Sequence, residues 1–543
     1  MFKTAPVMSV QERPSATHPS NSAMALPERL AAIVGPDRVL DDPESRTFYS
    51  TDLASRGRQT SAVVQVSSTD ELAAVVGECA RADVAMIPRG GGFSYTGGYT
   101  PVSENSVTID LRGIDRIVEI NETDMYVRVG VGCTWHDLYT ALKQRGLRTP
   151  YFGPMSGFSA TVGGALSQGS FFLGSTEYGT VMESVLSIEM VLADGSIIHT
   201  ASDSATGVGP FYRNYGPDLT GLFLADTGAL GFKAVATLKL LRFPPHQGYG
   251  SFAFANSRQA LAALSEIGRS GLAAEAYVWD PYFVKVMSQA STGMRQDLAF
   301  LMSVVRNGAT VLDGVRAGLR IALAGRKVFR PDTHLLQITI DDHSAAGAAA
   351  RLAGIRKIAL AHGADEVAPS VPRALRAMPF TNFNVPERRT AERNLPTNSL
   401  YPHSVAPAAQ VAIAALFARH AAELERLGIK VGTVFFAVGK SALCIEPLIY
   451  WDDEDHLAHD RIAQTSDLAR LEACDGPSEA TAYAHAMRTE LKAIMQKHGA
   501  VHVQIGRAYD LLGTREPRVA ELLRQIKQAV DPRRLVNPGS LGL

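Results

Sequence analysis

Residues 86–99 read MIPRGGGFSYTGGY, and this stretch decides the fold. An apolar strand runs into three consecutive glycines at 90–92, which let the backbone approach a ligand closely and leave several N–H groups pointing the same way. Such a loop suits an anionic phosphate, and the neighbouring Arg89 adds positive charge. A second glycine-rich stretch at 153–169, GPMSGFSATVGGALSQG, favours a nucleotide or dinucleotide site over an ordinary turn.

The segments around this loop alternate between strand and helix signals. AVVQV at 62–66 is a β-branched run, and Thr69 precedes the helical segment DELAAVVGECARAD, which a Thr or Ser can cap. This strand–helix–strand unit indicates an α/β arrangement. Other expected elements are strands at 84–87, 106–111, 125–132 and 232–242, a helix after Thr134, and a hairpin through Asp194-Gly195 within 184–200.

Beyond Pro244-Pro245 the composition of the sequence and its pattern of expected helices and strands change. Ala-rich helical stretches at 344–362 and 405–427 alternate with candidate strands, which predicts a separate α+β domain. The candidate strands are 335–341, 433–438 and 442–451. The chain ends with a helix at 515–530 and the segment DPRRLVNPGSLGL.

Composition excludes several classes of protein. The 543 residues are 46% hydrophobic and 20% charged, so the chain can bury large cores and is not globally disordered. Lys plus Arg is 53 and Asp plus Glu is 54, which gives a net charge of −1 and no general excess for nucleic-acid binding. No apolar run reaches the ~18 residues of a membrane span. The four cysteines form no CxxC pair, which predicts reduced thiols in a cytoplasmic protein.

Other nucleotide and catalytic motifs fail when their spacing is checked. Gly92 is not followed by a glycine three residues on, so the Rossmann fingerprint is absent, and Val434 stands where a P-loop ending at 439–441 would need its first glycine. Ser156 has the wrong spacing for a nucleophile elbow. His456 and His459 lie among carboxylates, and a solvated acidic turn is favoured there over a metal site.

Five motifs occur together in one order: IPRGGGFSYTGGY, TVGGALSQG, LADG, DTGALGFKAVATLKLL and DPRRLVNPGSL. In this the chain resembles the FAD-binding flavoproteins of the vanillyl-alcohol oxidase and p-cresol methylhydroxylase fold, which include glycolate and D-lactate dehydrogenase-like enzymes. The resemblance implies an α+β protein, with a two-subdomain FAD-binding domain of the p-cresol methylhydroxylase type and an inserted α+β cap domain. The implied division is a disordered lead-in at 1–24, the FAD-binding domain at 25–245, the cap or substrate domain at 246–500, and a return to the FAD-binding domain at 501–543.

The resemblance also assigns cofactor-binding residues, with the first glycine loop around the pyrophosphate and the second along the ribityl chain and ring. Val235 is expected near the adenine and Asn537 near the pyrimidine end of the flavin. The full set is Pro88, Arg89, Gly90, Gly91, Gly92, Phe93, Ser94, Pro154, Thr161, Gly163, Gly164, Ser167, Gly169, Val235 and Asn537.

The chain departs from its relatives at two points. Phe93 stands where covalent members often place a histidine, so non-covalent FAD is expected, with a linkage through Tyr401 or His403 as the alternative. The HxGDGNxH-like metal segment of the D-lactate and 2-hydroxyglutarate dehydrogenase branch is absent. No metal is therefore expected.

Catalytic candidates come from VHVQIGRAYDLL at 501–512 and from His403. Arg507 matches the arginine of the Tyr-Arg pair in the phenol-oxidising branch, whereas Gly506 replaces the tyrosine and Tyr509 follows two residues later. A guanidinium group holds a phenolate or carboxylate well, and an imidazole can take a hydroxyl proton near neutral pH. Structural roles are the alternatives for Arg507 and His403.

The resemblance implies an FAD-dependent oxidoreductase that oxidises an alcohol or 2-hydroxy acid by hydride transfer to flavin N5. Oxidation of para-substituted phenols is the alternative, and a flavin-binding protein without turnover is a second one. The expected partners are a small-molecule substrate and an electron acceptor such as oxygen, a cytochrome or a quinone. No nucleic acid or membrane span is expected, and a homodimer is left open.

Overall fold

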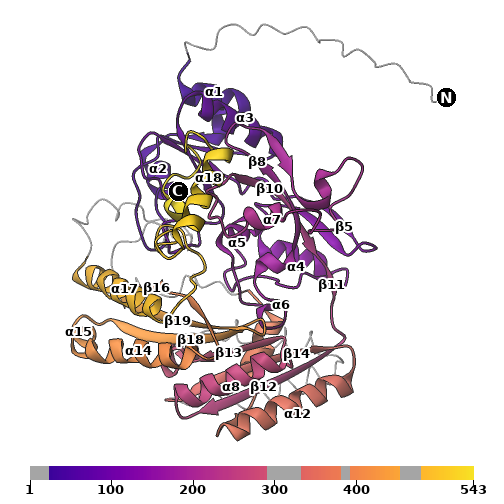
Figure 1. Cartoon of the computed structure of the whole chain (residues 1–543), viewed down its shortest axis with the longest axis vertical. Helices are drawn as coiled ribbons and strands as arrows, with labels where there is room; N and C mark the ends of the chain where they lie inside the picture. The colour runs from indigo at the N-terminus through magenta and orange to yellow at the C-terminus, as the bar shows by residue number, and fades with distance from the viewer. Residues whose placement is uncertain (1–23, 290–331, 381–391, 453–477) are drawn as a thin grey trace, which may run out of the picture.

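The computed structural model describes residues 24–289, 332–380, 392–452 and 478–543. Two sheets built from the first half of the chain occupy one half of the molecule, and a large sheet built from later residues occupies the other (Figure 1). The helix at the C-terminal end lies with the first half rather than with the elements that precede it (Figure 1). No helix in the described ranges is both long and apolar enough to cross a bilayer.

The first sheet carries the glycine loop at the end of a parallel strand. Its order is β1-β2-β4-β3, and β2 and β3 both run parallel to β4. The crossover between them is α3, Thr69–Arg81, which begins after Ser68 because the Ser68 hydroxyl accepts a hydrogen bond from the Glu71 N–H. The cap is thus Ser68, one residue before the Thr69 suggested by the sequence. The strands are β1 Val39–Leu40, β2 Ala62–Gln65, β3 Ala85–Arg89 and β4 Ser106–Asp110.

The second sheet is antiparallel, in the order β5-β6-β10-β8-β9. The hairpin predicted at Asp194-Gly195 is confirmed, since β8 and β9 pair antiparallel on either side of it. The sequence signals missed β5, which is short and half-buried. The strands are β5 Ile117–Asn121, β6 Tyr126–Gly130, β8 Val185–Val191, β9 Ile197–His199 and β10 Phe232–Lys239, with the small pair β7 Leu147–Arg148 and β11 Leu241–Arg242 beside them.

The third sheet has the path β15-β12-β14-β13-β18-β19-β16, with β17 also paired to β19. The three strands expected here from the sequence are present as β14, β18 and β19, whereas β12, β13, β15, β16 and β17 were not anticipated. The bounds are β12 His246–Phe254, β13 Glu275–Trp279, β14 His334–Asp342, β15 Asp365–Val367, β16 Glu392–Pro396, β17 Ser399–Pro402, β18 Lys430–Val438 and β19 Ala442–Asp452.

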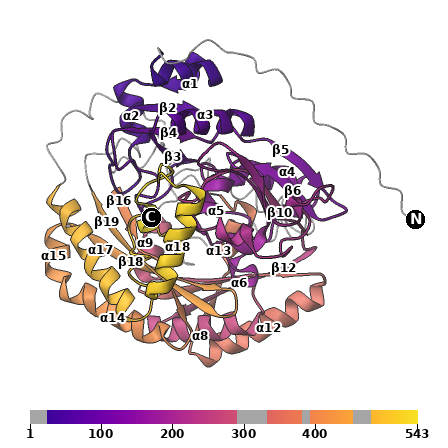
Figure 2. The ribbon, with the colours of Figure 1, turned by 45° about the horizontal axis from the view of Figure 1, so that its top comes forward.

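Helices cover the two faces of this third sheet differently (Figure 2). The outer face packs on α8, α12, α14 and α17 through an apolar core that includes Phe435, Leu443 and Ile445. The inner face, which carries Phe436 and Cys444 on the alternate positions, meets Phe171 and Val503 instead. The inner face is therefore turned toward the glycine-rich half of the molecule.

The two Ala-rich stretches expected from the sequence both form helices. The predicted stretch 405–427 is broken into two helices at His420, and 344–362 is a single helix, α12. The helices are α1 Leu26–Val34, α2 Pro43–Tyr49, α4 Trp135–Lys143, α5 Val162–Gln168, α6 Ser175–Tyr178, α7 Leu219–Leu222, α8 Ser257–Ser270, α9 Pro281–Gln289, α12 Ala345–Ala361, α13 Ser370–Ala377, α14 Ala406–Arg419, α15 Ala421–Arg426, α17 Glu479–Lys497 and α18 Pro517–Val530.

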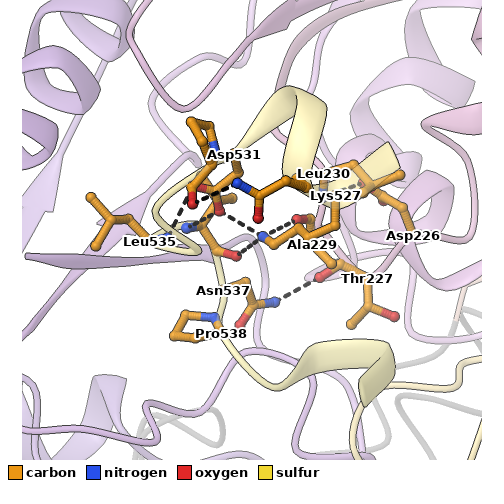
Figure 3. A network of polar contacts seen from close by, with 12 residues as sticks. Asp226, Thr227, Ala229, Leu230, Lys527, Asp531, Leu535, Asn537 and Pro538 are labelled. Atoms are coloured by element: carbon orange, nitrogen blue, oxygen red, sulfur yellow. Dashed lines mark hydrogen bonds and ion pairs between the residues drawn. The ribbon is translucent and has the colours of Figure 1, made fainter. Parts of the chain in front are cut away.

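The last residues of the chain return to the first sheet and pair with the strand that leads into the glycine loop. Val536 forms a parallel bridge with Met86, and the Met86 carbonyl accepts a hydrogen bond of 2.8 Å from the Asn537 N–H. A buried lysine at the end of α18 fixes this segment (Figure 3). Its Nζ atom, on Lys527, contacts Asp531 Oδ2 and the Ala229 carbonyl, both at 2.6 Å.

Candidate functional site

A cavity lies between the two glycine-rich loops, beneath the start of β10. Both loops predicted to bind a nucleotide contribute to its wall, together with residues 227–233 of the segment that leads into β10. The lining residues are Pro88, Arg89, Gly90, Gly98, Tyr99, Leu111, Val131, Thr161, Gly163, Gly164, Ser167, Gln168, Thr227, Gly228, Gly231, Phe232 and Lys233. Seven of the fifteen cofactor-binding residues expected from the sequence therefore border one cavity.

The glycines of the first loop are required by how closely the second loop approaches. A Cβ on Gly91 would lie 1.9 Å from the Ser159 carbonyl oxygen, and one on Gly90 would lie 2.5 Å from Thr161 Oγ1. A side chain at Gly91 would require the backbone to move, and one at Gly90 would displace the Thr161 hydroxyl. The two loops thus touch at their backbones, on one side of the cavity.

Arg89 holds the first loop from behind. Its buried guanidinium group donates to the carbonyls of Tyr49 and Thr51 and lies 4.8 to 5.1 Å from the ring centroids of three aromatic residues. The rings are Phe48, Tyr49 and Tyr99. Arg89 is therefore engaged with the protein, although it also borders the cavity.

The second loop leads into the short helix α5, whose start is held by Thr161. The Thr161 hydroxyl accepts a hydrogen bond from the Gly164 N–H at 3.3 Å, and Gly169 ends the helix in the left-handed conformation, with φ +66°. Gln168 on the last turn points a buried side-chain oxygen that has no partner among the described residues. That oxygen is an acceptor available to a bound ligand.

The C-terminal return lies behind the cavity wall and contacts two of its lining residues. Asn537 is fully buried and donates from its side chain to the carbonyls of Gly98 and Thr227, at 2.7 and 2.8 Å. Both Thr227 and Asn537 have positive φ values, of +51° and +43°, an uncommon conformation that tight contacts maintain here. Figure 3 shows Asn537 and Thr227 side by side below the Lys527 network.

Arg507 joins the first loop to the C-terminal return. Its guanidinium group donates to the carbonyls of Gly97 and Thr100, and to Asn537 Oδ1 and the Pro538 carbonyl at 2.8 Å each. Burial lowers its pKa to about 10, and the nearby Asp52 opposes that shift. This set of contacts gives Arg507 a structural function next to the cavity.

Asp52 fixes the same loop from the opposite side. Its buried carboxylate accepts hydrogen bonds from the N–H groups of Ala54, Ser55 and Gly97, the last at 2.6 Å. Burial raises the pKa of Asp52, and the three backbone donors oppose that rise. The conformation of Gly97 and Gly98, at the end of the first loop, thus depends on Asp52, which lies outside residues 86–99.

Tyr509 and His403 lie in different places. Tyr509 is buried, stacks on His502 with ring centroids 4.0 Å apart, and lies 5.8 Å from the Arg488 guanidinium carbon. His403 instead contacts Ser265 of α8 and the Lys440 carbonyl, both at 3.0 Å, on the outer side of the third sheet. The three catalytic candidates, Arg507, Tyr509 and His403, therefore do not lie together in one site.

The remaining predicted cofactor residues do not border the cavity. Val235 lies on the central strand β10, between β6 and β8, and the nearby Gly231–Lys233 stretch lines the cavity instead. Gly92, Phe93 and Ser94 continue the first loop away from it, and Pro154 lies in the turn before α5. His456 and His459 fall outside the described residues.

Several lining residues were missed by sequence reasoning. Gly98 and Tyr99 belong to the quoted first motif, and Thr227, Gly228 and Gly231 belong to DTGALGFK, so the signal was present in the motifs themselves. A Cβ on Gly228 would lie 2.7 Å from Pro88 Cγ, which explains a glycine at that position. Gln168 carried no separate signal.

The part of the chain that carries both glycine-rich loops matches a known family. Residues 60–201 match the family model described as an FAD binding domain. The chain therefore contains an FAD-binding domain, and its fold is that of p-cresol methylhydroxylase. The flavoprotein superposes on p-cresol methylhydroxylase with substrate bound with a TM-score of 0.71 and 18% identity, over 95% of this chain and 96% of the other. On an alkyldihydroxyacetonephosphate synthase the TM-score is 0.64 with 16% identity, over 97% and 87% of the two chains.

Two curated relatives match the glycine-rich half. The glycolate oxidase subunit GlcD of Bacillus subtilis (strain 168) is 31% identical over 218 residues, which are 40% of the flavoprotein and 45% of GlcD. The mitochondrial D-lactate dehydrogenase [cytochrome] 1 of Saccharomyces cerevisiae is 27% identical over 233 residues, or 42% and 38% of the two chains. The flavoprotein thus spans less than half the length of these relatives.

The cavity fits the cofactor that the family model names. Its lining glycines let a ligand approach the backbone closely, which suits a pyrophosphate, and the buried Gln168 oxygen suits a cofactor N–H group. FAD supplies a two-electron acceptor when it is bound there. The residues of the chain supply binding, orientation and exclusion of water.

Proposed function

We propose that this flavoprotein is an FAD-dependent oxidoreductase that oxidises an alcohol or a 2-hydroxy acid by hydride transfer to flavin N5. The observation that carries the proposal is the cavity between two glycine loops that touch, with Asn537 from the other end of the chain hydrogen-bonded to two residues of its wall. The similarity of residues in the matched segment to GlcD and D-lactate dehydrogenase supports the substrate class.

The same proposal treats the third sheet and its helices as a cap over the flavin ring. The inner face of that sheet meets Phe171 and Val503 at the border of the glycine-rich half, which supports a substrate site between the two. Within it, Tyr509 belongs to the substrate side, and Arg507 holds the loop and the C-terminal return in register. Pro88, Thr161, Gly163, Gly164 and Ser167 would hold FAD with Arg89 and the loop glycines.

FAD is proposed to bind non-covalently. Tyr401 is buried in the outer-face core, and His403 is occupied by Ser265 and Lys440, so neither candidate for a covalent link borders the cavity. Acid precipitation tests this point, because non-covalent FAD goes into the supernatant. We also propose a cytoplasmic location, which the buried free thiols of Cys79, Cys133 and Cys444 support.

Oxidation of para-substituted phenols is the second candidate. The observation that favours it is the position of Arg488, whose guanidinium carbon lies 5.8 Å from the ring centroid of the buried Tyr509. A guanidinium group beside a phenol ring suits the binding of a substrate phenolate. Anaerobic reduction of the flavin by a panel of D-2-hydroxy acids and para-hydroxybenzyl alcohols separates the two. Reduction by hydroxy acids alone supports the first, reduction that follows phenol ionisation supports the second, and a yellow protein that no donor reduces supports a flavin-binding protein without turnover.

Air or an artificial acceptor added after that reduction identifies the electron acceptor class. Rapid reoxidation by oxygen supports an oxidase, and reoxidation only by a cytochrome or quinone analogue supports a dehydrogenase.

A further inference from the structure

A glutamate lies on the inner face of the third sheet, in the middle of a strand. Glu446 is two residues from Cys444 on β19, so the two side chains lie on the same face. Cys444 packs against Phe171 and Val503, which belong to the glycine-rich half and to the C-terminal return. Glu446 therefore points toward the proposed flavin domain rather than toward the outer helices.

The neighbours of Glu446 across the sheet are apolar. Glu446 is paired with Val434 on β18, and Val434 is paired in turn with Trp279 on β13. Among the described residues no hydrogen bond or ion pair reaches the Glu446 carboxyl group, and burial raises its pKa to about 7. A carboxyl group in such surroundings changes its charge near neutral pH.

The surroundings of Glu446 are not sealed by the described side chains. Glu446 and Phe436 on the sheet are half-buried, and so are Tyr95 and Asn394 from neighbouring segments. Residues on an interior face are fully buried when they pack against a core, as Val434 and Cys444 are. The partial exposure of Glu446 on an inward face means that the packing between the sheet and the glycine-rich half does not fully enclose its side chain.

Tyr95 links the surroundings of Glu446 to the first glycine loop. It follows the first glycine cluster, three residues before Gly98, which lines the cavity. Its carbonyl accepts a hydrogen bond of 2.9 Å from Arg488 of α17, and its hydroxyl is hydrogen-bonded to Asn394. Burial raises the pKa of Tyr95 and of Tyr509, and the charge of Glu446 adds to both shifts, so the carboxyl group lies near both phenols.

Titratable groups from several elements lie near Glu446. Tyr95 comes from the first loop, Cys444 from β19 itself and Tyr509 from the C-terminal return. Burial lowers the pKa of His485 and His502, and the cations Arg488 and Lys492 of α17 add to that shift, as Arg393 of β16 does for His485. Asp52 is a second carboxylate that acts on Tyr95, but its own oxygens are bonded to backbone N–H groups.

We propose that Glu446 is the general base of the oxidation, the residue that accepts the hydroxyl proton of the substrate. The inference rests on the proposed function. It assigns to Glu446 the role of proton acceptor that the sequence had suggested for His403. The substrate loses its hydroxyl proton to the Glu446 carboxylate and its C–H hydrogen, with two electrons, to the bound oxidised flavin. The carbinol carbon becomes a carbonyl, and the proton on Glu446 passes to solvent when the flavin is reoxidised.

The test is the rate of anaerobic flavin reduction as a function of pH in the FAD-loaded full chain, for wild type, Glu446→Gln and Glu446→Asp. We expect the wild-type rate to rise with pH through an apparent pKa near 7, as the carboxylate forms. Glu446→Gln should lower the rate about 100-fold or more and remove this rise, because a positioned general base contributes ~10²–10⁴-fold. Glu446→Asp should retain the rise and recover part of the rate.

A readout without substrate accompanies the kinetics. Infrared difference spectra of the wild type between pH 5 and pH 9 should show a buried carboxyl group that deprotonates near pH 7, and Glu446→Gln should lack that band. Glu425→Gln, at an exposed position on α15, is the matched control and should leave the rate, its pH dependence and the band unchanged.

The outcomes separate the inference from the proposed function. If no donor reduces wild-type flavin, the proposed function fails. If donors reduce the wild type and Glu446→Gln keeps the rate and its rise with pH, the general-base proposal is overturned while the proposed function stands. A Glu446→Gln protein that retains FAD and melts at least as high as the wild type at pH 6 but loses the rate supports the proposal.

Discussion

At Gly91 the chain has no room for a side chain. A Cβ atom there would lie 1.9 Å from a backbone oxygen, which cannot rotate away as a side chain can. Gly91→Ala must therefore push the two loops apart, at a cost of about 1–3 kcal/mol in the free energy of unfolding, and should weaken FAD binding strongly. The ratio of flavin to protein absorbance after gel filtration measures the loss.

The matched control for that change is Gly209→Ala. Gly209 is exposed, has no heavy atom within 4 Å of its Cβ position and does not have a positive φ, so alanine should leave FAD content and melting temperature unchanged. Equal FAD content in Gly91→Ala and wild type would contradict the assignment of the first loop to the cofactor.

Glu446 should also make folding stability depend on pH. Its pKa is raised from 4.5 to about 7 in the folded chain, so the folded state holds a proton that the unfolded state has released. The resulting stability is fully present below pH 4.5 and is lost as pH rises through 7. Glu446→Gln cannot lose a proton and escapes this loss.

We expect the unfolding free energy of Glu446→Gln, relative to that of wild type, to increase by about 2–3 kcal/mol from pH 5 to pH 8.5. Urea titrations of both proteins at the two pH values measure it. A difference that does not change with pH would mean that the carboxyl group is ionised throughout.

At the scale of elements, the C-terminal segment after α18 is held by one buried charge pair. Lys527 and Asp531 are each 1% exposed, and Asp531 also accepts hydrogen bonds from the N–H groups of Leu535 and Val536. These contacts set the position of Asn537 at the cavity. The C-terminal end of α18 thus fixes the position of the segment that carries Asn537.

Lys527→Met should therefore cost about 3–5 kcal/mol, because it leaves a buried carboxylate without its cation. It should also reduce FAD content, since the Asn537 contacts to Gly98 and Thr227 depend on this segment. Thermal unfolding with and without added FAD measures both effects. Lys430→Met, at an exposed position, is the control, and a Lys527→Met protein as stable as that control would refute the role of the pair.

The sequence predicted the elements with strong local signals. The glycine loops, the hairpin at Asp194-Gly195 and the helix α4 with its Thr134 cap all follow from backbone requirements that a few neighbouring residues impose. The strands β12 and β13 were not predicted because their apolar and polar residues follow no regular pattern. Their position in the sheet is set by pairing with β14.

The candidate site was predictable where a motif contacts the ligand cavity itself. Gly90, Thr161 and Gly163 fall in that class. Arg507 and His403 do not, because only the folded chain shows that one guanidinium group is bound by carbonyls and that one imidazole lies behind the sheet. Glu446 gave no local signal, since its character comes from burial between segments far apart in the sequence.

At the scale of the whole molecule, buried arginines tie the two halves together. Arg148, on β7 of the glycine-rich half, donates to Asp341 Oδ2 of β14 at 2.9 Å, and Arg376 of α13 lies 3.2 Å from both Asp341 and Glu275. Arg148 and Asp341 are 1% and 7% exposed, so solvent screens the pair very little. These contacts join the third sheet to the glycine-rich half.

A double-mutant cycle of Arg148→Met and Asp341→Asn should give a coupling energy of about 1–3 kcal/mol in unfolding free energy. The exposed pair Arg356 and Glu366 serves as the reference and should couple by less than about 1 kcal/mol. Additive effects at Arg148 and Asp341 would show that the halves are held by apolar contacts alone.

The central claim is that this chain uses FAD to oxidise an alcohol or a 2-hydroxy acid. The most direct measurement is stopped-flow mixing of the FAD-loaded protein with a panel of D-2-hydroxy acids and hydroxybenzyl alcohols in the absence of oxygen. The account predicts bleaching of the flavin absorbance by at least one donor, with one equivalent of the matching carbonyl product formed per FAD. Flavin that stays oxidised with every donor, in a protein that dithionite reduces fully, would contradict the account.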